Sequence, residues 1–365
     1  MSYIAVLPGD GIGPEVINEA IKVIKSVEDL TANKFDLKYG IVGGESIDKY
    51  GIPLPEDTIK LIENSKAILF GAVGGPKWDN LESNLRPELG ILNIRKRLDL
   101  YANLRPVKVF EALKDSSPVK SSILKNVDIL IIRELTSGLY FGEPKKQIEE
   151  NSKRSAVDTM YYDEYEIERI VRMSFKIAQS RTKKLTSVDK SNVLETSKLW
   201  RKIVDEVSLD YPDVKLQHIL VDNAAMQLIL HPSQFDVVVS ENTFGDILTD
   251  EASILSSSLG MLPSASLSFL PGENFNNLKS LYEPIHGSAP DIAGKSIANP
   301  IGMILSTAMM FEFAFENKDI SDLIVKTVEN VINSGLRTKD ISHGSQWCKT
   351  SEMGDTIASQ IRSTV

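Results

Sequence analysis

The stretch YIAVLPGDGIGPEVINEAIKVI, residues 3–24, decides the fold class of the chain. Its first part, Tyr3 to Leu7, is a short apolar run, and the glycine-rich turn 9–13 follows directly. Pro14 then starts a segment whose apolar residues recur at helical spacing. This order predicts a strand, a tight turn and an amphipathic helix. The turn is open to two interpretations, a bare turn or a ligand loop, because its G-x-G-x-G spacing departs from the dinucleotide-binding pattern G-x-G-x-x-G.

Three more apolar runs end on glycine or polar residues. Residues 67–73 lead into two glycines, residues 127–132 lead into Arg133 and Glu134, and residues 235–240 lead into Glu241 and Asn242. Strands that end this way are typical of an α/β protein whose site lies at one edge of the sheet.

Three other segments carry structural predictions. Residues 197–207 have the apolar spacing of an amphipathic helix. Residues 301–315 predict a core helix opened by Pro300, since the run is shorter than the ~20 residues that span a membrane. The polar segment 140–162 is either a surface loop or a projecting hairpin.

Composition excludes several classes of protein. The 365 residues are enough for two domains, and the formal charge of -9 disfavours binding to nucleic acid or to an anionic membrane. Cys348 is the only cysteine, which rules out an intrachain disulfide and a cysteine-based zinc site. The N-terminus has no basic segment or apolar core of a signal peptide, so we expect a cytoplasmic protein.

Three arginines are candidates for binding carboxylates. Arg95 lies in a helical run, Arg105 lies in the sequence NLRP, and Arg133 ends an apolar strand. A guanidinium matches a carboxylate through two parallel hydrogen bonds. Each arginine taken alone is more often part of a structural salt bridge, and their spacing does not bring them together.

Three aspartates are candidates for binding a metal. Asp246 and Asp250 are four residues apart, on one face of a predicted helix, and Asp222 ends another apolar run. Carboxylate oxygens suit Mg²⁺ or Mn²⁺ better than zinc. A solvated helix face is the alternative, although the apolar flanks of the two helical aspartates favour a buried use.

The remaining candidates are Lys190, Tyr140 and a loop of small residues. A single lysine or tyrosine is usually a surface or core residue. The loop, residues 283–294 with continuation to Asn299, is dense in glycine, serine and alanine, which lets a ligand approach the backbone closely. Its Asp291 favours recognition of a ligand with hydroxyl groups.

The motifs NLRP, RELTSGLYFGEP, VDKSNVL, FGDILTDEAS and EPIHGSAPDIAGKSIANP occur together and in this order. With them the chain resembles the β-decarboxylating dehydrogenases, the family of isocitrate and isopropylmalate dehydrogenases that also includes homoisocitrate and tartrate dehydrogenases. The resemblance covers essentially the whole chain.

The resemblance implies oxidation and decarboxylation of a 2-hydroxy dicarboxylic acid. It makes Lys190 the base for the C2 hydroxyl and Tyr140 the acid that protonates the enol carbon. Asp222, Asp246 and Asp250 would bind Mg²⁺ or Mn²⁺. The implied substrate-binding residues are Arg95, Arg105, Arg133, Asp222, Glu88, Ile91 and Leu92.

The implied oxidant is NAD. Asp291 can accept hydrogen bonds from a ribose 2′-hydroxyl and would repel a 2′-phosphate, which favours NAD over NADP. The implied cofactor-binding residues are Gly75, Glu88, Asn192, Glu283, His286, Gly287, Ser288, Ala289, Asp291, Ile292 and Asn299.

The family fold consists of two α/β domains that share a large mixed sheet, and it is not a Rossmann fold. The implied domains are 1–102 plus 258–365, which binds the cofactor, and 103–257, which carries an arm and a dimer interface. In this family Lys190 and Asp222 would come from the neighbouring subunit, so we expect a homodimer with shared active sites and a small-molecule substrate.

Within the family, the apolar pair Ile91 and Leu92 favours isopropylmalate, because isocitrate and homoisocitrate bring a third carboxylate. Such apolar contacts discriminate by only ~1–3 kcal/mol. The alternatives are a relative that acts on tartrate, malate or homoisocitrate, and a homologue that binds the cofactor without turnover.

Overall fold

A computed structural model of the protein describes residues 3–31, 33–82, 85–272, 279–344 and 346–364. The chain divides into two compact units. Unit 1 comprises Met1–Leu100, Val109–Ser121 and Ser253–Val365, and unit 2 comprises Tyr101–Lys108 and Ser122–Ala252. Each unit is described by itself below. None of the described helices is both long enough and apolar enough to cross a membrane.

Unit 1 is built on five strands in the order β2-β1-β3-β12-β11. Strand β1 is parallel to β2 and β3, β12 is parallel to β3, and β11 is antiparallel to β12. The strands are β1 (Tyr3–Gly9), β2 (Asp36–Tyr39), β3 (Ala67–Ala72), β11 (Pro263–Leu267) and β12 (Ser280–Pro284). The helices are α1 (Gly13–Thr31), α2 (Gly44–Tyr50), α3 (Glu56–Glu63), α4 (Glu88–Arg97), α9 (Ile301–Phe313), α10 (Lys318–Asn333) and α11 (Thr350–Arg362).

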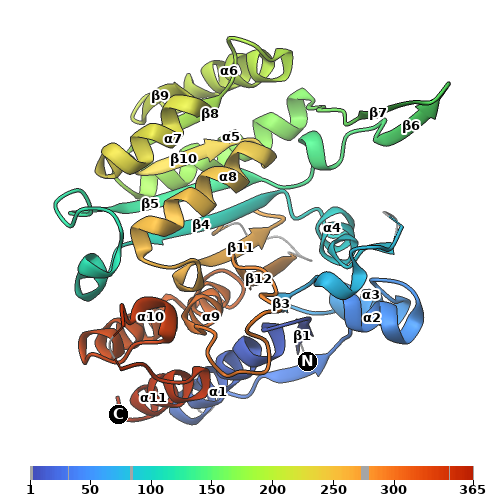
Figure 1. Ribbon diagram of the computed structural model, residues 1–365. Helices are drawn as coiled ribbons and strands as arrows, with labels where there is room; N and C mark the ends of the chain where they lie inside the picture. Colours follow the sequence, from blue (N-terminus) through green and yellow to red (C-terminus); the bar gives the residue numbers. More distant parts are fainter. Residues whose placement is uncertain (1–2, 32, 83–84, 273–278, 345, 365) are drawn as a thin grey trace. The chain divides into compact units, whose positions relative to one another are not determined.

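The opening stretch folds as predicted, into β1, a turn and α1 (Figure 1). The glycines of the turn are required by close packing. A Cβ on Gly9 would lie 1.9 Å from the carbonyl oxygen of Ala72, and one on Gly11 would lie 2.0 Å from that of Ser288. Both glycines also have positive φ, which disfavours any side chain. The glycines therefore let the turn pack closely against the end of β3 and against the loop that contains Ser288.

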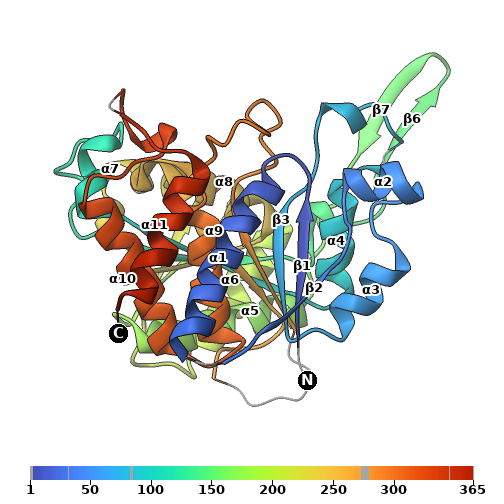
Figure 2. The same ribbon diagram turned by 90° about the horizontal axis from the view of Figure 1, so that it is seen from below.

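Helices cover both faces of the unit 1 sheet. Figure 2 shows β1 and β3 with α1 on one side and α4 on the other, and α1 beside α11. Helix α9 is buried on nearly all sides, which explains its continuous apolar sequence and confirms the predicted core helix. On the other face, Ile91 and Ile94 of α4 belong to a buried apolar cluster that includes Phe70 of β3.

Unit 2 holds five strands in the order β4-β5-β10-β8-β9 and a separate two-stranded hairpin. Strand β4 is antiparallel to β5, and the other neighbours are parallel. The strands are β4 (Ala102–Lys108), β5 (Asp128–Glu134), β6 (Lys146–Glu150), β7 (Lys153–Val157), β8 (Lys184–Asp189), β9 (Lys215–Leu220) and β10 (Val237–Ser240). The helices are α5 (Glu164–Ser180), α6 (Glu195–Ser208), α7 (Val221–Leu230) and α8 (Asn242–Ser253).

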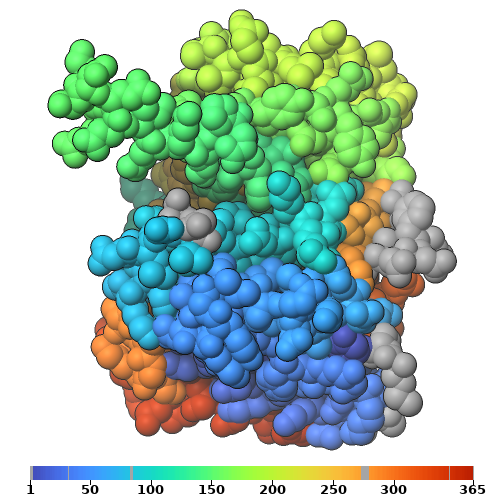
Figure 3. All heavy atoms as spheres, turned by 90° about the vertical axis from the view of Figure 1, so that its right-hand side faces the viewer, coloured from blue at the N-terminus to red at the C-terminus, as the bar shows by residue number. Residues whose placement is uncertain are grey.

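The polar segment 140–162 contains the hairpin β6–β7, so the projecting-hairpin alternative is confirmed. Figure 3 shows the hairpin, in green, standing out from the surface of unit 2. Its side chains are almost all exposed, which explains their polar sequence. The predicted helix 197–207 is part of α6, whose apolar face is buried within unit 2 through Trp200, Ile203 and Val204. Both units are α/β with mixed sheets, as expected.

Candidate active site

Two arginines from neighbouring strands of unit 2 meet one aspartate. Arg105 lies on β4, Arg133 lies on β5, and the antiparallel register places Asn103 opposite Arg133. Both guanidinium groups contact Oδ1 of Asp246 in α8: Arg133 Nη1 pairs with it, and Arg105 Nη1 lies 3.3 Å away. Arg133 is 2 % exposed and Arg105 is 5 % exposed. Two buried guanidinium groups that share one carboxylate carry more positive charge than their partner cancels, so together they can bind a further anion.

Two asparagines orient these arginines. Asn242 Oδ1 accepts hydrogen bonds from Arg133 Nε at 3.0 Å and Nη2 at 2.8 Å, and its Nδ2 donates to the carbonyl oxygen of Ser137 at 3.0 Å. Arg105 Nε donates to Asn103 Oδ1. Neutral acceptors fix the direction of a guanidinium without cancelling its charge. Both asparagines lie near candidate residues in the sequence, but neither was predicted to have a role. An uncharged amide side chain gives no sequence signal that it orients an arginine.

Tyr140 joins this group from the short 3₁₀ helix η4 (Gly138–Tyr140). Its hydroxyl donates to Asp246 Oδ2 at 3.1 Å, and the Arg133 guanidinium lies 5.6 Å from its ring centre. Burial and the negative charge of Asp246 raise the pKa of the Tyr140 hydroxyl. The group therefore carries its proton at neutral pH and can donate it.

Asp246 and Asp250 lie on one face of α8 as predicted, but they are not buried. The Asp246 side chain is 33 % exposed and that of Asp250 is 61 % exposed. The expected burial is not seen in the single chain, because the apolar residues that flank the two aspartates in sequence lie outside α8, in β10 and at residues 254–255. Asp250 Oδ1 lies 4.0 Å from Arg105 Nη1, and partial burial raises the pKa of its carboxyl.

The third predicted metal ligand, Asp222, forms a separate pair with Lys190. Lys190 Nζ donates to Asp222 Oδ1 at 2.7 Å, which lowers the pKa of that carboxyl. Asp222 follows β9, which is two strands away from β10, and strands lie ~4.8 Å apart. Within the described part of the chain, no three His, Cys, Asp or Glu side chains are placed to hold one metal ion. A metal site formed by all three aspartates therefore stays a prediction. It requires Asp222 to come from a second copy of the chain.

The third arginine belongs to unit 1. Arg95 in α4 is 9 % exposed, and its Nη2 donates to Glu283 Oε1 of β12 at 2.8 Å. Glu283, predicted to bind the cofactor, thus holds a guanidinium in this structure. Ile91 is only 8 % exposed and packs in the core, whereas Leu92 is half-buried. Leu92 is therefore the member of the predicted apolar pair that can meet a substrate.

The loop of small residues forms an irregular segment of unit 1, as expected. His286 Nδ1 lies 2.9 Å from the carbonyl oxygen of Gly287, and burial lowers the pKa of its imidazole. Asp291 is exposed. Asn299 is 5 % exposed, and its amide bonds Asp340 and the start of α9. The structure gives Asn299 a structural role, while the exposed Asp291 is available to a ligand.

The other predicted residues differ in exposure. Glu88 is exposed in the first turn of α4, and its carboxylate lies over Gly74, next to the predicted Gly75. Asn192 is exposed two residues after Lys190 in unit 2. Ser288 is nearly buried, and its carbonyl oxygen accepts from the backbone N–H of Ile12 at 2.8 Å. That these residues bind a cofactor stays a prediction.

The sequence model for isocitrate/isopropylmalate dehydrogenase matches residues 3–357. A 3-isopropylmalate dehydrogenase from Aquifex aeolicus is 56 % identical over 355 residues, which cover 97 % of this chain and 95 % of the relative. One from Bacillus subtilis is 53 % identical over 361 residues, 99 % of this chain and 97 % of the relative.

Solved structures of similar fold support the same relationship. An isocitrate dehydrogenase from Methylococcus capsulatus superposes with a TM-score of 0.86 at 33 % identity, covering 99 % of this chain and 100 % of that one. A β-decarboxylating dehydrogenase from Thermococcus kodakarensis, in its apo form, has a TM-score of 0.78 at 35 % identity, covering 100 % and 97 %.

Proposed function

Because the chain belongs to the isocitrate/isopropylmalate dehydrogenase family, we propose that it oxidises and decarboxylates (2R,3S)-3-isopropylmalate in leucine biosynthesis. The products are 4-methyl-2-oxopentanoate, CO₂ and NADH. The observation that carries the proposal is the convergence of Arg105, Arg133 and Tyr140 on Asp246. Relatives of the same name at 51–56 % identity favour isopropylmalate over the other acids of the family.

Substrate binding rests on the arginines. The two carboxylates of the malate part replace the carboxylate of Asp246 as partners of Arg105 and Arg133, whose charges are already buried and aligned. Arg95, held by Glu283, is the third candidate partner. The isopropyl group faces Leu92 of α4. A third carboxylate, as in isocitrate, would meet this leucine without a partner, which is costly.

The donors on α8 fit a divalent cation. Mg²⁺ commonly uses one or two protein carboxylates and fills its remaining positions with water and substrate oxygens. Asp246 and Asp250 supply two such carboxylates, both partly open to solvent. Asp222 of a neighbouring subunit would supply a third. Bound Mg²⁺ or Mn²⁺ would act as a Lewis acid toward the C2 oxygen of the substrate.

Two side chains move protons. Lys190 of the neighbouring subunit takes the proton of the C2 hydroxyl, directly or through one water, as hydride leaves C2. The resulting 2-keto acid has a carboxylate β to its ketone, so CO₂ departs and leaves an enolate. Tyr140 then donates its hydroxyl proton to the enolate carbon, for which its raised pKa keeps it protonated. The Tyr140 proton is restored from solvent.

The loop 287–299 and His286 would hold the adenosine half of NAD, which supplies the hydride acceptor. Asp291, exposed on this loop, would accept hydrogen bonds from the ribose hydroxyls and repel a 2′-phosphate. A neutral His286, consistent with its lowered pKa, suits stacking or hydrogen bonding to an uncharged base. NAD is therefore the proposed cofactor.

A cytoplasmic homodimer completes the proposal. Large apolar side chains are exposed on α7 and α8, namely Met226 at 52 %, Leu230 at 46 % and Ile247 at 60 %. A second copy that covers them would explain their exposure. These helices, and not α6, whose apolar face is already buried, are the proposed dimer surface.

The test is an assay of NADH production with 3-isopropylmalate, D-malate, tartrate, isocitrate and homoisocitrate as substrates. We expect the highest kcat/KM with 3-isopropylmalate, and loss of activity in EDTA that Mg²⁺ or Mn²⁺ restores. A higher kcat/KM with D-malate or homoisocitrate would refute the assigned substrate. Full activity in EDTA, after removal of bound metal, would refute the metal.

A further inference from the structure

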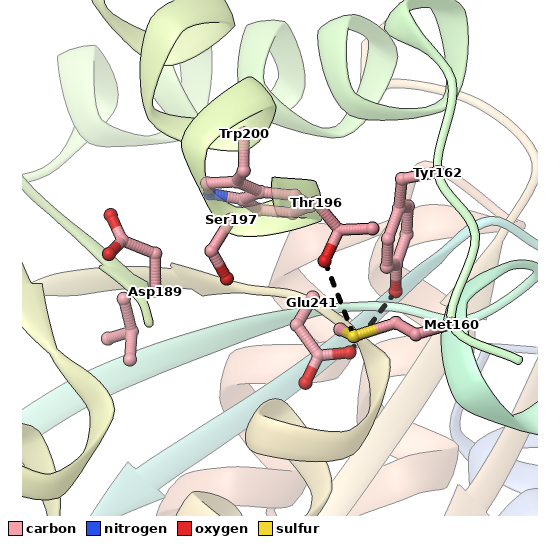
Figure 4. A pocket seen from close by; sticks show the side chains of 8 residues that line it. Met160, Tyr162, Asp189, Thr196, Ser197, Trp200 and Glu241 are labelled. Carbon is pink, nitrogen blue, oxygen red and sulfur yellow. Dashed lines mark hydrogen bonds between the residues drawn. The ribbon is translucent and has the colours of Figure 1, made fainter. Parts of the chain in front are cut away.

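Unit 2 holds a buried tyrosine hydroxyl between two buried carboxyl groups, and the mechanism above uses none of the three. Tyr162 Oη lies 3.4 Å from Glu134 Oε2 and 3.4 Å from Glu241 Oε2. Tyr162 is 5 % exposed, Glu134 0 % and Glu241 3 %. Figure 4 shows the Tyr162 hydroxyl directed at Glu241, beside Met160 and Trp200. The hollow next to Tyr162 and Glu241 has no room for a water molecule, so the hydrogen bonds of these buried groups come from the protein itself.

Glu134 fixes the turn that leads to Tyr140. It is the last residue of β5, and its carboxylate accepts from the backbone N–H of Thr136 at 2.9 Å and of Ser137 at 3.0 Å. The turn continues directly into η4. Its glycine, Gly138, has positive φ, and a Cβ there would lie 2.5 Å from Tyr162 Oη. The position of Tyr140 is thus set by a turn built around Glu134 and Tyr162.

Glu241 fixes the start of α8. Its carboxylate accepts from the backbone N–H of Thr243 at 3.0 Å and of Phe244 at 2.6 Å. These N–H groups have no partner within the helix, so the side chain of Glu241 caps it, and a negative charge is favoured at this end. Helix α8 carries Asp246, five residues further on. The direction of Asp246 therefore depends on a cap that Tyr162 contacts.

The Tyr162 hydroxyl also accepts from the backbone N–H of Asn242 at 3.0 Å. This is the residue whose side chain aligns Arg133. One hydroxyl proton cannot fully satisfy two carboxylates, and burial raises the pKa of Glu134 to about 7 and raises that of Glu241. The Tyr162 hydroxyl thus contacts both carboxyl groups and the start of α8, and it links two elements of the active site.

We propose that Tyr162 is a positioning residue: its hydroxyl ties the turn that carries Tyr140 to the helix that carries Asp246. The 3.1 Å hydrogen bond between Tyr140 and Asp246 is the contact that this tie maintains. The kinetic part of the inference rests on the proposed function. Nothing in the chemistry requires Tyr162 to touch the substrate.

The test compares Tyr162→Phe with Tyr211→Phe. Tyr211 is a matched control, because it is a buried tyrosine of the same unit, 8 % exposed, that stacks on Phe175 away from this network. We expect Tyr162→Phe to lower kcat with the isopropylmalate substrate about 10- to 100-fold, because small misplacements of reacting groups are costly. The KM for NAD should stay within about twofold, because the predicted cofactor loop belongs to unit 1. Tyr211→Phe should keep the wild-type kcat.

Amide hydrogen exchange supplies a readout that is independent of activity. Tyr162→Phe should speed exchange about tenfold or more at residues 136–138 and 242–244 together, while the strands of unit 2 keep their protection. If Tyr162→Phe does not fold, Glu134→Gln, which keeps the size of the side chain and removes its charge, is measured in the same way.

Two results would overturn the inference. One is wild-type kcat together with wild-type exchange at both segments. The other is faster exchange throughout unit 2 with no preference for the two segments, which would make Tyr162 a core residue only. If the wild-type protein turns over none of the acids, the proposed function fails, but the exchange comparison still decides whether Tyr162 forms the tie.

Discussion

Replacing Asn242 by alanine tests how the arginine pair is held. The side chain is 0 % exposed, and it accepts two hydrogen bonds from Arg133 and donates one to the carbonyl oxygen of Ser137. The substitution Asn242→Ala removes the hydrogen-bond partner of two buried guanidinium N–H groups and of one buried carbonyl oxygen. A buried polar group without a partner costs about 1–3 kcal/mol, and more if it is charged. Because Arg133 keeps its pairing with Asp246, we expect a total loss of about 3–5 kcal/mol in the free energy of unfolding.

The measurement is urea unfolding followed by circular dichroism and tryptophan fluorescence, with Asn18→Ala as control. Asn18 is exposed on α1, so its loss should change the free energy of unfolding by less than about 0.5 kcal/mol. In the folded variant Arg133 has lost its alignment, so kcat/KM for 3-isopropylmalate should fall about 100-fold, equivalent to about 2.7 kcal/mol. A loss of stability below about 1 kcal/mol with unchanged kcat/KM would show that Asn242 does not orient Arg133.

Three further predictions follow from the same geometry. Tyr140→Phe should lower kcat by about 10² to 10⁴ without lowering the unfolding temperature much, because it removes a proton donor and keeps the ring; near-normal turnover would exclude Tyr140 as the acid. Glu283→Ala should cost about 3 kcal/mol of stability by leaving Arg95 buried without its partner, and adding Arg95→Met should recover part of it in urea unfolding; no recovery would mean that the pair is not the cause. The raised pKa of Glu134, about 7 against 4.5, means that the folded state binds the proton more tightly than the unfolded state. This contribution to stability is complete below pH 4.5 and is lost as the pH rises to about 7. The free energy of unfolding of Glu134→Gln should therefore fall less between pH 5 and pH 7.5 than that of the wild type. Equal losses would contradict the raised pKa.

The local features follow from the spacing of residues along the chain. Apolar spacing identified β1, α1 and the core helix α9, since periodicity records which face of an element is buried. The placement of Asp246 and Asp250 on one helix face also followed from spacing, because four residues make about one turn. The order of the motifs indicated the family, which the comparisons with known proteins bear out.

Which of these residues come into contact depends on how the strands and helices pack together. Arg105, Arg133 and Tyr140 lie 141, 113 and 106 residues from Asp246 in sequence, and the register of β4 on β5 and of β5 on β10 brings them to it. No spacing along the chain encodes such a contact. Burial was equally invisible: Ile91 turned inward and Asp250 outward, against expectation, because packing between elements decides which side of a helix faces the core. The contact of Tyr162 with Glu134 and Glu241 belongs to the same class, since it exists only once β5, α5 and α8 have packed together.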